Sequence, residues 1–522
     1  MNSMFDRPLS PLERLLPFFF VAVFIMRLVL GGMTGLGDDE AYYWDWSRQL
    51  QLSYYDHPGM IAWLIKASTS VFGDTAFAVR LPAILCNTLA TLFLFLLAVD
   101  MFNLRVGLYA ATLHTMVPIF ALGGMMAVPD APMGFLWAFS AWLGWKIASK
   151  VSAGTFLGAE DRVSNGLWFL MGLALALGFL SKYTTVLVGL SILLYFFFNA
   201  SLRRVLFSPG FSLAILVVMV GAMPVLIWNG QHEWGSFAFH LSDRQSGGGG
   251  ANFGRWAQFW ISQIGFFTPV VFLLNVFAMF LALLKSSDAR WRYLFWLSFP
   301  TFMLFAGQAL FAEFKPHWPA PAHFTLLIAT AKLLEEGFGG REEFQRNARR
   351  RFAGWAIAIF VVPLFVLFHA AVLYPVIPKV AQFFAPAANW DPKFDPTNDL
   401  YGWPELAEHL EKIRQDREAN GTGRPYLASS RYQLVSQLAF ATKETVYRLS
   451  PTRDHYTYLQ TPEVIESLRD KPMLFVSDNR YERDPRGDVA NYHVFSMCAE
   501  LEPFVFKRGE VYARTFRIYD CR

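Results

Sequence analysis

The chain has few charged residues for its length. Asp, Glu, Lys and Arg make up only 16% of its 522 residues, whereas a soluble globular protein carries about 25%. Hydrophobic residues account for 54%, and the mean hydropathy is +0.31. This balance excludes an ordinary soluble protein and indicates a chain that crosses a membrane several times.

Several sequence motifs are also missing. The chain has no glycine-rich loop of the kind that cradles nucleotide phosphates, which disfavours an enzyme that uses soluble nucleotide sugars. No spacing resembles a zinc finger or a pair of histidines on one helix. A net charge of only +4 gives no sign of a nucleic-acid-binding surface. No small-residue cleavage site follows the first apolar run, so we expect an uncleaved first helix rather than a signal peptide.

Cysteine is scarce, with three residues in the whole chain. Cys86 lies in an expected membrane span and is expected to be buried as a small apolar side chain. Cys498 and Cys521 lie near the ends of two β-like runs in the C-terminal region. A disulfide between them is permitted if that region is in an oxidising compartment. Two free thiols are the alternative, because sequence alone fixes no geometry.

Apolar runs of membrane-spanning length, roughly 20 residues each, are abundant. They predict a mainly α-helical, polytopic membrane protein with about eleven transmembrane helices. The runs lie near residues 14–33, 82–101, 106–127, 131–149, 165–181, 183–200, 211–229, 259–284, 293–312, 318–334 and 353–375.

Lys and Arg cluster in alternate connections between these runs. The positive-inside rule assigns those connections, and the N-terminus, to the cytoplasm. The opposite face then receives residues 35–81 and everything after about Tyr374, together with most of the unusual polar residues. We therefore expect the chemistry on the periplasmic side of a bacterial inner membrane.

The composition changes after Pro375. Residues 1–376 are expected to form a transmembrane catalytic domain, whose first periplasmic loop is 35–81. Residues 377–399 are rich in Pro, Ala and Asn and are expected to be a linker. Residues 400–522 look soluble and predict a small α/β periplasmic domain. Its expected elements are a helix at 406–415 and strands at 472–476, 492–496 and 511–519.

The first outer loop contains three consecutive carboxylates followed by aromatic residues. Charged residues at membrane depth cost several kcal/mol and are usually functional, and aromatic residues suit the membrane interface. A solvated acidic loop or a helix cap is the alternative. The run is Gly37-Asp38-Asp39-Glu40-Ala41-Tyr42-Tyr43-Trp44, and Tyr54-Tyr55-Asp56-His57-Pro58 and Arg80-Leu81-Pro82 follow it.

This order of residues resembles bacterial members of the GT-C glycosyltransferase superfamily. The nearest likeness is to the lipid A aminoarabinose transferases and the dolichyl-phosphate-mannose protein mannosyltransferases, strongest over residues 37–82. The resemblance implies a GT-C membrane enzyme that takes a sugar from a polyprenyl-phosphate carrier. In the acidic pair of those families the base corresponds to Asp39, with Glu40 beside it. Asp130 matches a second carboxylate that approaches the donor or a metal, with a helix N-cap as the alternative.

Transfer from a phosphate-linked donor needs a base for the acceptor hydroxyl and positive charge for the departing phosphate. His57 stands where the aminoarabinose transferases have a Lys, and a pair with Asp56 is the alternative. Lys182 lies on the outer side against the positive-inside trend, and snorkelling from a helix end is the alternative. The expected phosphate-binding residues are His57, Lys182, Arg244, Lys315 and His317.

Sugar or acceptor contacts are expected from other residues of the outer segments, since aromatic rings stack on sugar faces and polar groups bind hydroxyls. These residues are Tyr42, Tyr43, Tyr55 and Glu313. Metal use is left open: Glu40, Asp130 and His57 could form a site for a hard or borderline ion.

We therefore expect an inverting membrane glycosyltransferase that moves a hexose or pentose from undecaprenyl phosphate to an acceptor hydroxyl. Lipid A or another lipid-linked glycan is the first choice of acceptor, and a protein hydroxyl the second. We expect a monomer without a nucleic-acid partner. A transporter or flippase for lipid-linked sugars is the rival, but such proteins bind at the bilayer midplane and often contain internal repeats, which we do not find. A non-catalytic scaffold would leave the acidic run unexplained.

Overall fold

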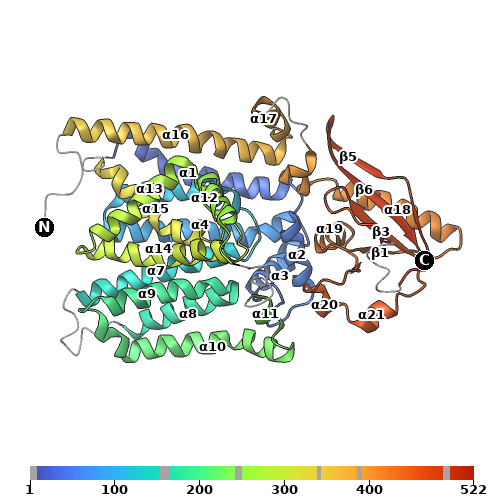
Figure 1. Cartoon of the computed structure of the whole chain (residues 1–522), viewed down its shortest axis with the longest axis horizontal. Coiled ribbons are helices and arrows are strands. Elements are labelled where there is room, and N and C mark those ends of the chain that lie inside the picture. The colour runs from blue at the N-terminus through green and yellow to red at the C-terminus, as the bar shows by residue number, and fades with distance from the viewer. Residues whose placement is uncertain (1–8, 153–163, 241–249, 338–342, 385–390, 486–493) are drawn as a thin grey trace. The chain divides into compact units, whose positions relative to one another are not determined.

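A computed structural model describes residues 9–152, 164–240, 250–337, 343–384, 391–485 and 494–522 (Figure 1). The contacts divide the chain into two compact units. The first unit comprises residues 1–28, 51–61 and 83–366, and the second comprises residues 29–50, 62–82 and 367–522. Most of the first outer loop is therefore grouped with the C-terminal region, whereas the expected division at residues 376 and 399 followed composition.

The first unit consists of helices, three of which (α1, α4 and α16) continue into the second unit. Its elements are α1 (Pro11–Met33), α4 (Ala76–Met101), α5 (Leu104–Met116), α6 (Pro118–Gly123), α7 (Asp130–Ser152), α8 (Asn165–Ser181), η1 (Tyr183–Thr185), α9 (Val186–Phe198), η2 (Arg203–Phe207), α10 (Pro209–Gln231), α11 (Gly235–Ala238), α12 (Phe253–Phe267), α13 (Pro269–Leu284), α14 (Ala289–Phe311), α15 (Ala320–Glu336) and α16 (Glu343–Leu373).

Several of these helices are suited to a membrane. In the described part of the chain, five helices are long and apolar enough to cross a bilayer, namely α1, α4, α10, α14 and α16, or six if α12 and α13 count as one span. The prediction of a mainly helical, multi-pass membrane protein is confirmed. The number of such helices is lower than the eleven expected from the apolar runs.

Two expected spans are interrupted in front of a proline. The run 106–127 forms α5 and α6, which are separated at the extended residue Val117, with Pro118 next in the chain. The run 259–284 forms α12 and α13, which meet at 108°. Between them, Thr268 has φ 65° and ψ 151°, and Pro269 begins α13. A proline lacks the N–H of a helical hydrogen bond and disfavours helical backbone in the residue before it, which explains why the helix is interrupted at both positions.

Glycines let α8 and α10 approach each other closely (Figure 1). A Cβ on Gly172 would lie 2.7 Å from the backbone oxygen of Ala214, and one on Gly221 would lie 2.4 Å from the Cβ of Ala176. Small residues at helix contacts are typical of membrane proteins, where packing rather than the hydrophobic effect drives helix association.

The second unit contains short helices and one mixed sheet. Its strands are ordered β2-β1-β3-β6-β4, with β5 also paired to β6; β1 is parallel to β2 and β3, and β6 is antiparallel to its partners. Its elements are α2 (Asp38–Arg48), α3 (Met60–Phe72), α17 (Ile377–Phe384), η4 (Pro392–Phe394), η5 (Pro396–Leu400), α18 (Trp403–Ala419), β1 (Tyr426–Ser429), α19 (Tyr432–Thr442), β2 (Val446–Arg448), α20 (Tyr456–Leu459), α21 (Pro462–Glu466), β3 (Met473–Asp478), β4 (Cys498–Glu500), β5 (Phe504–Arg508) and β6 (Val511–Cys521).

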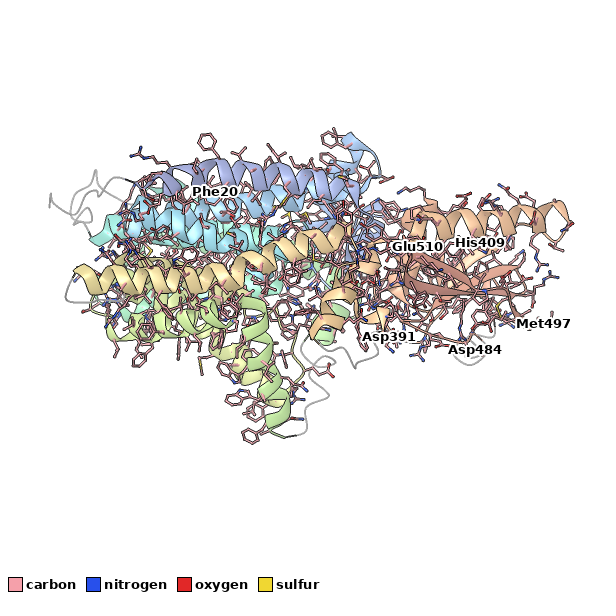
Figure 2. The ribbon with its side chains drawn as sticks, turned by 90° about the horizontal axis from the view of Figure 1, so that it is seen from above. Phe20, Asp391, His409, Asp484, Met497 and Glu510 are labelled. Carbon is pink, nitrogen blue, oxygen red and sulfur yellow. A yellow bond between two sulfur atoms is a disulfide. The ribbon has the colours of Figure 1, made fainter. Side chains whose placement is uncertain are left out.

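The C-terminal region combines helices and strands, as expected from the sequence. The helix expected at 406–415 lies within α18, and the strands expected at 472–476 and 511–519 correspond to β3 and β6. The strand expected at 492–496 is wrong for residues 494–496, since β4 begins at Cys498; residues 492 and 493 lie outside the described residues. Helix α18 covers the sheet, and His409 stacks on Phe504 with ring centroids 5.1 Å apart (Figure 2).

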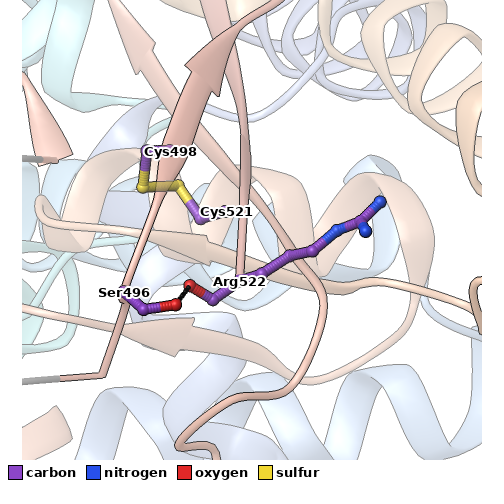
Figure 3. Close-up of a disulfide and its surroundings, with 4 residues drawn as sticks. All are labelled: Ser496, Cys498, Cys521 and Arg522. Carbon is purple, nitrogen blue, oxygen red and sulfur yellow. Dashed lines mark hydrogen bonds between the residues drawn. A yellow bond between two sulfur atoms is a disulfide. The ribbon is translucent and has the colours of Figure 1, made fainter.

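The two C-terminal cysteines are bonded to each other. Cys498 of β4 and Cys521 of β6 face each other across the strand pair and form a disulfide (Figure 3). Beside it, the Ser496 hydroxyl donates to the backbone oxygen of Arg522 at 2.8 Å. The third cysteine, Cys86, is a free thiol that is only partly buried, so the expectation of a fully buried side chain is wrong.

Candidate active site

The three carboxylates of the first outer loop occupy the first turn of α2 in the second unit. Gly37 precedes the helix in an extended conformation, and its N–H donates to Glu40 Oε2 at 2.8 Å. Acidic side chains in the first turn are stabilised by the positive end of the helix dipole. Glu40 therefore acts as a helix cap, which was the alternative for this acidic run. Asp38 and Asp39 lie beside it in the same turn.

Glu40 is bound by Arg80, which was not among the predicted site residues. Arg80 Nε lies 2.8 Å from Oε1 and Arg80 Nη2 lies 2.6 Å from Oε2. The guanidinium also donates to the backbone oxygens of Gly31, Thr34 and Gly35. Glu40 is 1% exposed and Arg80 is 3% exposed. The pair therefore fixes the chain before α2. The sequence signal that could have identified Arg80 as a partner is the Arg80-Leu81-Pro82 motif.

The two aspartates differ in their surroundings. Asp39 is exposed, and the hydroxyl of Tyr432 donates to its Oδ1 at 3.0 Å. Asp38 is partly buried, and Gln437 Nε2 donates to its Oδ1 at 3.1 Å. Burial and the nearby Asp399 raise the pKa of Asp38 to about 7, against the opposing effects of Arg514, Gln437 and Arg480. Asp38 was predicted only as a member of the acidic run, and Tyr432 and Gln437 were missed, because they are distant from α2 in the chain.

The expected sugar-binding tyrosines of α2 are packed against protein. Tyr42 is 3% exposed and Tyr43 is 6% exposed. The Tyr42 ring lies 4.5 Å from that of Tyr432 and 5.6 Å from that of Tyr456, and its hydroxyl accepts the N–H of His455 at 3.0 Å. These contacts join α2 to the C-terminal domain, and a contact of either tyrosine with sugar stays a prediction.

A second group of expected residues meets in the first unit. Lys182 Nζ lies 2.8 Å and 2.7 Å from the two carboxylate oxygens of Asp130. Burial alone would raise the pKa of Asp130, but the positive charges of Lys182 and His317 lower it. Ser181 Oγ donates to the Pro129 backbone oxygen at 2.7 Å, which fixes the two segments together. Asp130, Lys182 and His317, predicted from separate motifs, are thus electrostatic neighbours.

His57 and Tyr55 lie in a further aromatic and polar cluster of the first unit. The His57 ring centroid is 5.8 Å from that of His240, whose Nε2 lies 2.8 Å from the Asp56 backbone oxygen. Tyr55 packs on Phe239 at 4.9 Å. His240 was not among the predicted site residues. The signal that could have identified it is its place beside Phe239 in a segment that mixes aromatic and polar residues.

The remaining expected residues are only partly placed. Arg244 lies outside the described residues. Glu313 and Lys315 are exposed on the link between α14 and α15, which Gln263 holds by donating to the Pro316 backbone oxygen at 2.9 Å. Among the residues that the structure describes, no group of three or more His, Cys, Asp or Glu side chains is arranged to hold a metal ion. Both carboxylate oxygens of Glu40 are bound by Arg80.

Known proteins share this fold and parts of this sequence. The fold matches the crystal structure of ArnT from Cupriavidus metallidurans in the apo state with a TM-score of 0.62, covering 98% of each chain at 16% identity. Residues 56–228 match the family described as dolichyl-phosphate-mannose-protein mannosyltransferase. The chain is thus similar, in part of its sequence and in its fold, to glycosyltransferases of the GT-C superfamily. Another fold neighbour of this chain is the archaeal oligosaccharyltransferase AglB from Archaeoglobus fulgidus, with a TM-score of 0.54 at 12% identity, over 96% of this chain and 74% of the other.

This chain has sequence relatives with more specific names. It is 29% identical over 343 residues to the lipid A galacturonosyltransferase RgtD of Rhizobium johnstonii, which covers 65% of this chain and 67% of the relative. It is 30% identical over 182 residues to the undecaprenyl phosphate-α-4-amino-4-deoxy-L-arabinose arabinosyl transferase of Serratia proteamaculans. That match covers 32% of this chain and 31% of the relative, so the chain spans about a third of the length of that arabinosyl transferase.

Proposed function

We propose that this protein transfers a sugar from a polyprenyl-phosphate donor to a hydroxyl of lipid A or another lipid-anchored glycan. The observation that carries the proposal is the first turn of α2, where a buried Glu40–Arg80 pair holds the chain and Asp39 is exposed beside it. The names of the sequence relatives support a lipid A acceptor and an undecaprenyl-phosphate donor.

In the proposed reaction, Asp39 accepts the proton of the acceptor hydroxyl as its oxygen attacks the anomeric carbon of the sugar. The bond between that carbon and the phosphate oxygen breaks, and the polyprenyl phosphate departs with the bonding electron pair. One displacement of this kind inverts the anomeric centre. A phosphate is already a competent leaving group, so a base and positive charge for the phosphate suffice.

The positive charge is proposed to come from residues predicted in the sequence. Lys182 is the first candidate, because its ammonium is held by Asp130, which is also an electrostatic neighbour of His317. His57, Lys315 and Arg244 are the further candidates. A carrier phosphate would compete with Asp130 for Lys182, so Asp130 would keep the lysine in place between turnovers.

A uronic acid is the first donor sugar to test. The match to the galacturonosyltransferase extends over 65% of this chain, whereas the match to the arabinosyl transferase extends over 32%. We further propose a monomer in a bacterial inner membrane, with a cytoplasmic N-terminus and a periplasmic C-terminal domain, on the basis of the alternating basic connections.

A transfer assay tests this function. Detergent-purified protein is incubated with lipid A and with polyprenyl phosphate carrying radiolabelled galacturonic acid, or 4-amino-4-deoxy-arabinose in a parallel reaction. Label appearing in lipid A would support the proposal. Label appearing instead in added periplasmic protein would show that the acceptor is a protein and would contradict the lipid A assignment. Movement of labelled lipid across vesicles without any transfer would contradict the proposal and favour a flippase.

A further inference from the structure

The sheet of the second unit has a topological switch point between β1 and β3. The chain runs from β1 through α19 to β2 on one side of β1, and then through α20 and α21 to β3 on the other side. In open α/β sheets, ligands bind at the carboxyl ends of the strands at such a point. Arg431 follows β1 and Tyr481 follows β3, and the Arg431 guanidinium lies 5.9 Å from the centre of the Tyr481 ring.

Helix α19, which follows β1 at this switch point, packs against α2, which carries the three carboxylates. Helix α19 begins at Tyr432, whose hydroxyl donates to Asp39 Oδ1 at 3.0 Å. Further along α19, Gln437 Nε2 donates to the Leu36 backbone oxygen at 2.8 Å and to Asp38 Oδ1 at 3.1 Å. One helix of the C-terminal domain thus binds both aspartates, at the edge of the sheet where α/β proteins place ligands.

The Tyr432 side chain is itself held in place. Its ring lies 4.5 Å from the ring of Tyr42, one turn after Asp39 on α2. Tyr42 in turn packs on Tyr456 and accepts the His455 N–H, and Tyr456 donates to Asp45 Oδ2 at 2.7 Å. A phenol restrained by stacking loses little further conformational freedom when it binds a carboxylate, so its hydrogen bond can orient an otherwise exposed side chain.

We propose that Tyr432 is a positioning residue for Asp39, so that the C-terminal domain supplies part of the catalytic arrangement. This inference rests on the proposed function, in which Asp39 accepts the proton. The phenol donates one hydrogen bond and carries no charge, so it restricts rotation of the carboxylate and stabilises its ionised form. Both effects favour proton acceptance from a hydroxyl in a fixed place.

The test compares Tyr432→Phe with wild type and with Tyr512→Phe. Tyr512 is a matched control, because its hydroxyl contacts Asn479 and Thr515 of the same domain and its removal leaves α2 untouched. The kcat, the donor KM and the pH dependence of kcat/KM are measured for each purified full-length protein, with thermal unfolding as a check on folding. Tyr432→Phe keeps the ring and its stack on Tyr42, so we expect it to fold.

We expect Tyr432→Phe to lower kcat about tenfold with little change in donor KM, because only the orientation of the base is lost. The acid limb of the pH profile should move to higher pH by about one unit, because the ionised carboxylate loses a donor. Tyr512→Phe should match wild type. An unchanged kcat, or a lower kcat with an unmoved acid limb, would overturn the inference while leaving the proposed function in place. A wild-type protein that transfers no sugar would overturn both.

Discussion

Arg80 and Glu40 form a nearly fully buried ion pair in which Nη2 lies 2.6 Å from Oε2. A buried ion pair is weak evidence of net stability, but removal of one partner leaves an uncompensated charge. We predict that Arg80→Met destabilises the protein by about 3–5 kcal/mol, measured by thermal unfolding. Lys412→Ala breaks an exposed pair with Glu408 at 2.9 Å and should change stability by less than about 1 kcal/mol. Equal effects of the two variants would contradict the conclusion that Arg80 fixes the chain before α2.

Asp38 should make stability fall as the pH rises. Burial and Asp399 raise its pKa to about 7 from a usual value of 3.8. Because the folded value is the higher one, the stabilising contribution of the protonated carboxyl is complete below about pH 4 and is lost as the pH rises through 7. Asp38→Asn keeps an oxygen that can accept from Gln437. The melting temperature of this variant minus that of wild type should increase as the pH rises from about 5 to about 8.5. A constant difference would show that Asp38 does not titrate in this range.

Lys182 should affect donor binding more than folding. We predict that Lys182→Met raises the donor KM about tenfold, as expected for the loss of a charge-assisted contact to phosphate. Lys146→Met is the matched control, because Lys146 also forms a 2.7 Å pair, with Asp100, yet has no proposed ligand. Initial rates at varied donor concentration distinguish the two. A KM that rises equally in both variants would show that Lys182 has only a structural role.

The contact between α8 and α10 gives a stability test within one helix. A Cβ on Gly221 would lie 2.4 Å from the Cβ of Ala176, whereas a Cβ on Gly230, also in α10, would meet nothing within 4 Å. Gly221→Ala should therefore cost about 1–3 kcal/mol through overpacking, and Gly230→Ala should be neutral or slightly stabilising. Thermal unfolding in detergent measures both, and a neutral Gly221→Ala would mean that the helices separate without cost.

Much of the membrane fold could be predicted from the sequence because apolar runs of spanning length report directly on helices. The breaks at Val117-Pro118 and Thr268-Pro269 were missed, since the apolar composition continues through both prolines. The strand at 492–496 was misplaced because a short β-like run carries little positional information. Parallel pairing of β1 with β2 and β3 depends on contacts between distant segments, which no local pattern reports.

The candidate site was predictable where charge stands against an apolar background. The acidic run with Asp39, and Lys182, were singled out in this way, since charged side chains beside a membrane are costly. Asp130 was predicted from the family resemblance. The partners were not found: Arg80 lies 40 positions from Glu40, and Tyr432 lies 393 positions from Asp39. The raised pKa of Asp38 depends on Asp399 in the C-terminal region, so it has no local sequence signal.

The most direct test of the account is sugar transfer by Asp39→Asn. Asp416→Asn is its control, because it removes an exposed carboxylate from α18 of the same unit. We predict that wild type and Asp416→Asn move label from the polyprenyl-phosphate sugar to lipid A. Asp39→Asn should lose at least about a hundredfold in kcat, as for loss of a general base, with unchanged thermal unfolding. Near-normal turnover by Asp39→Asn would contradict the assignment of the base.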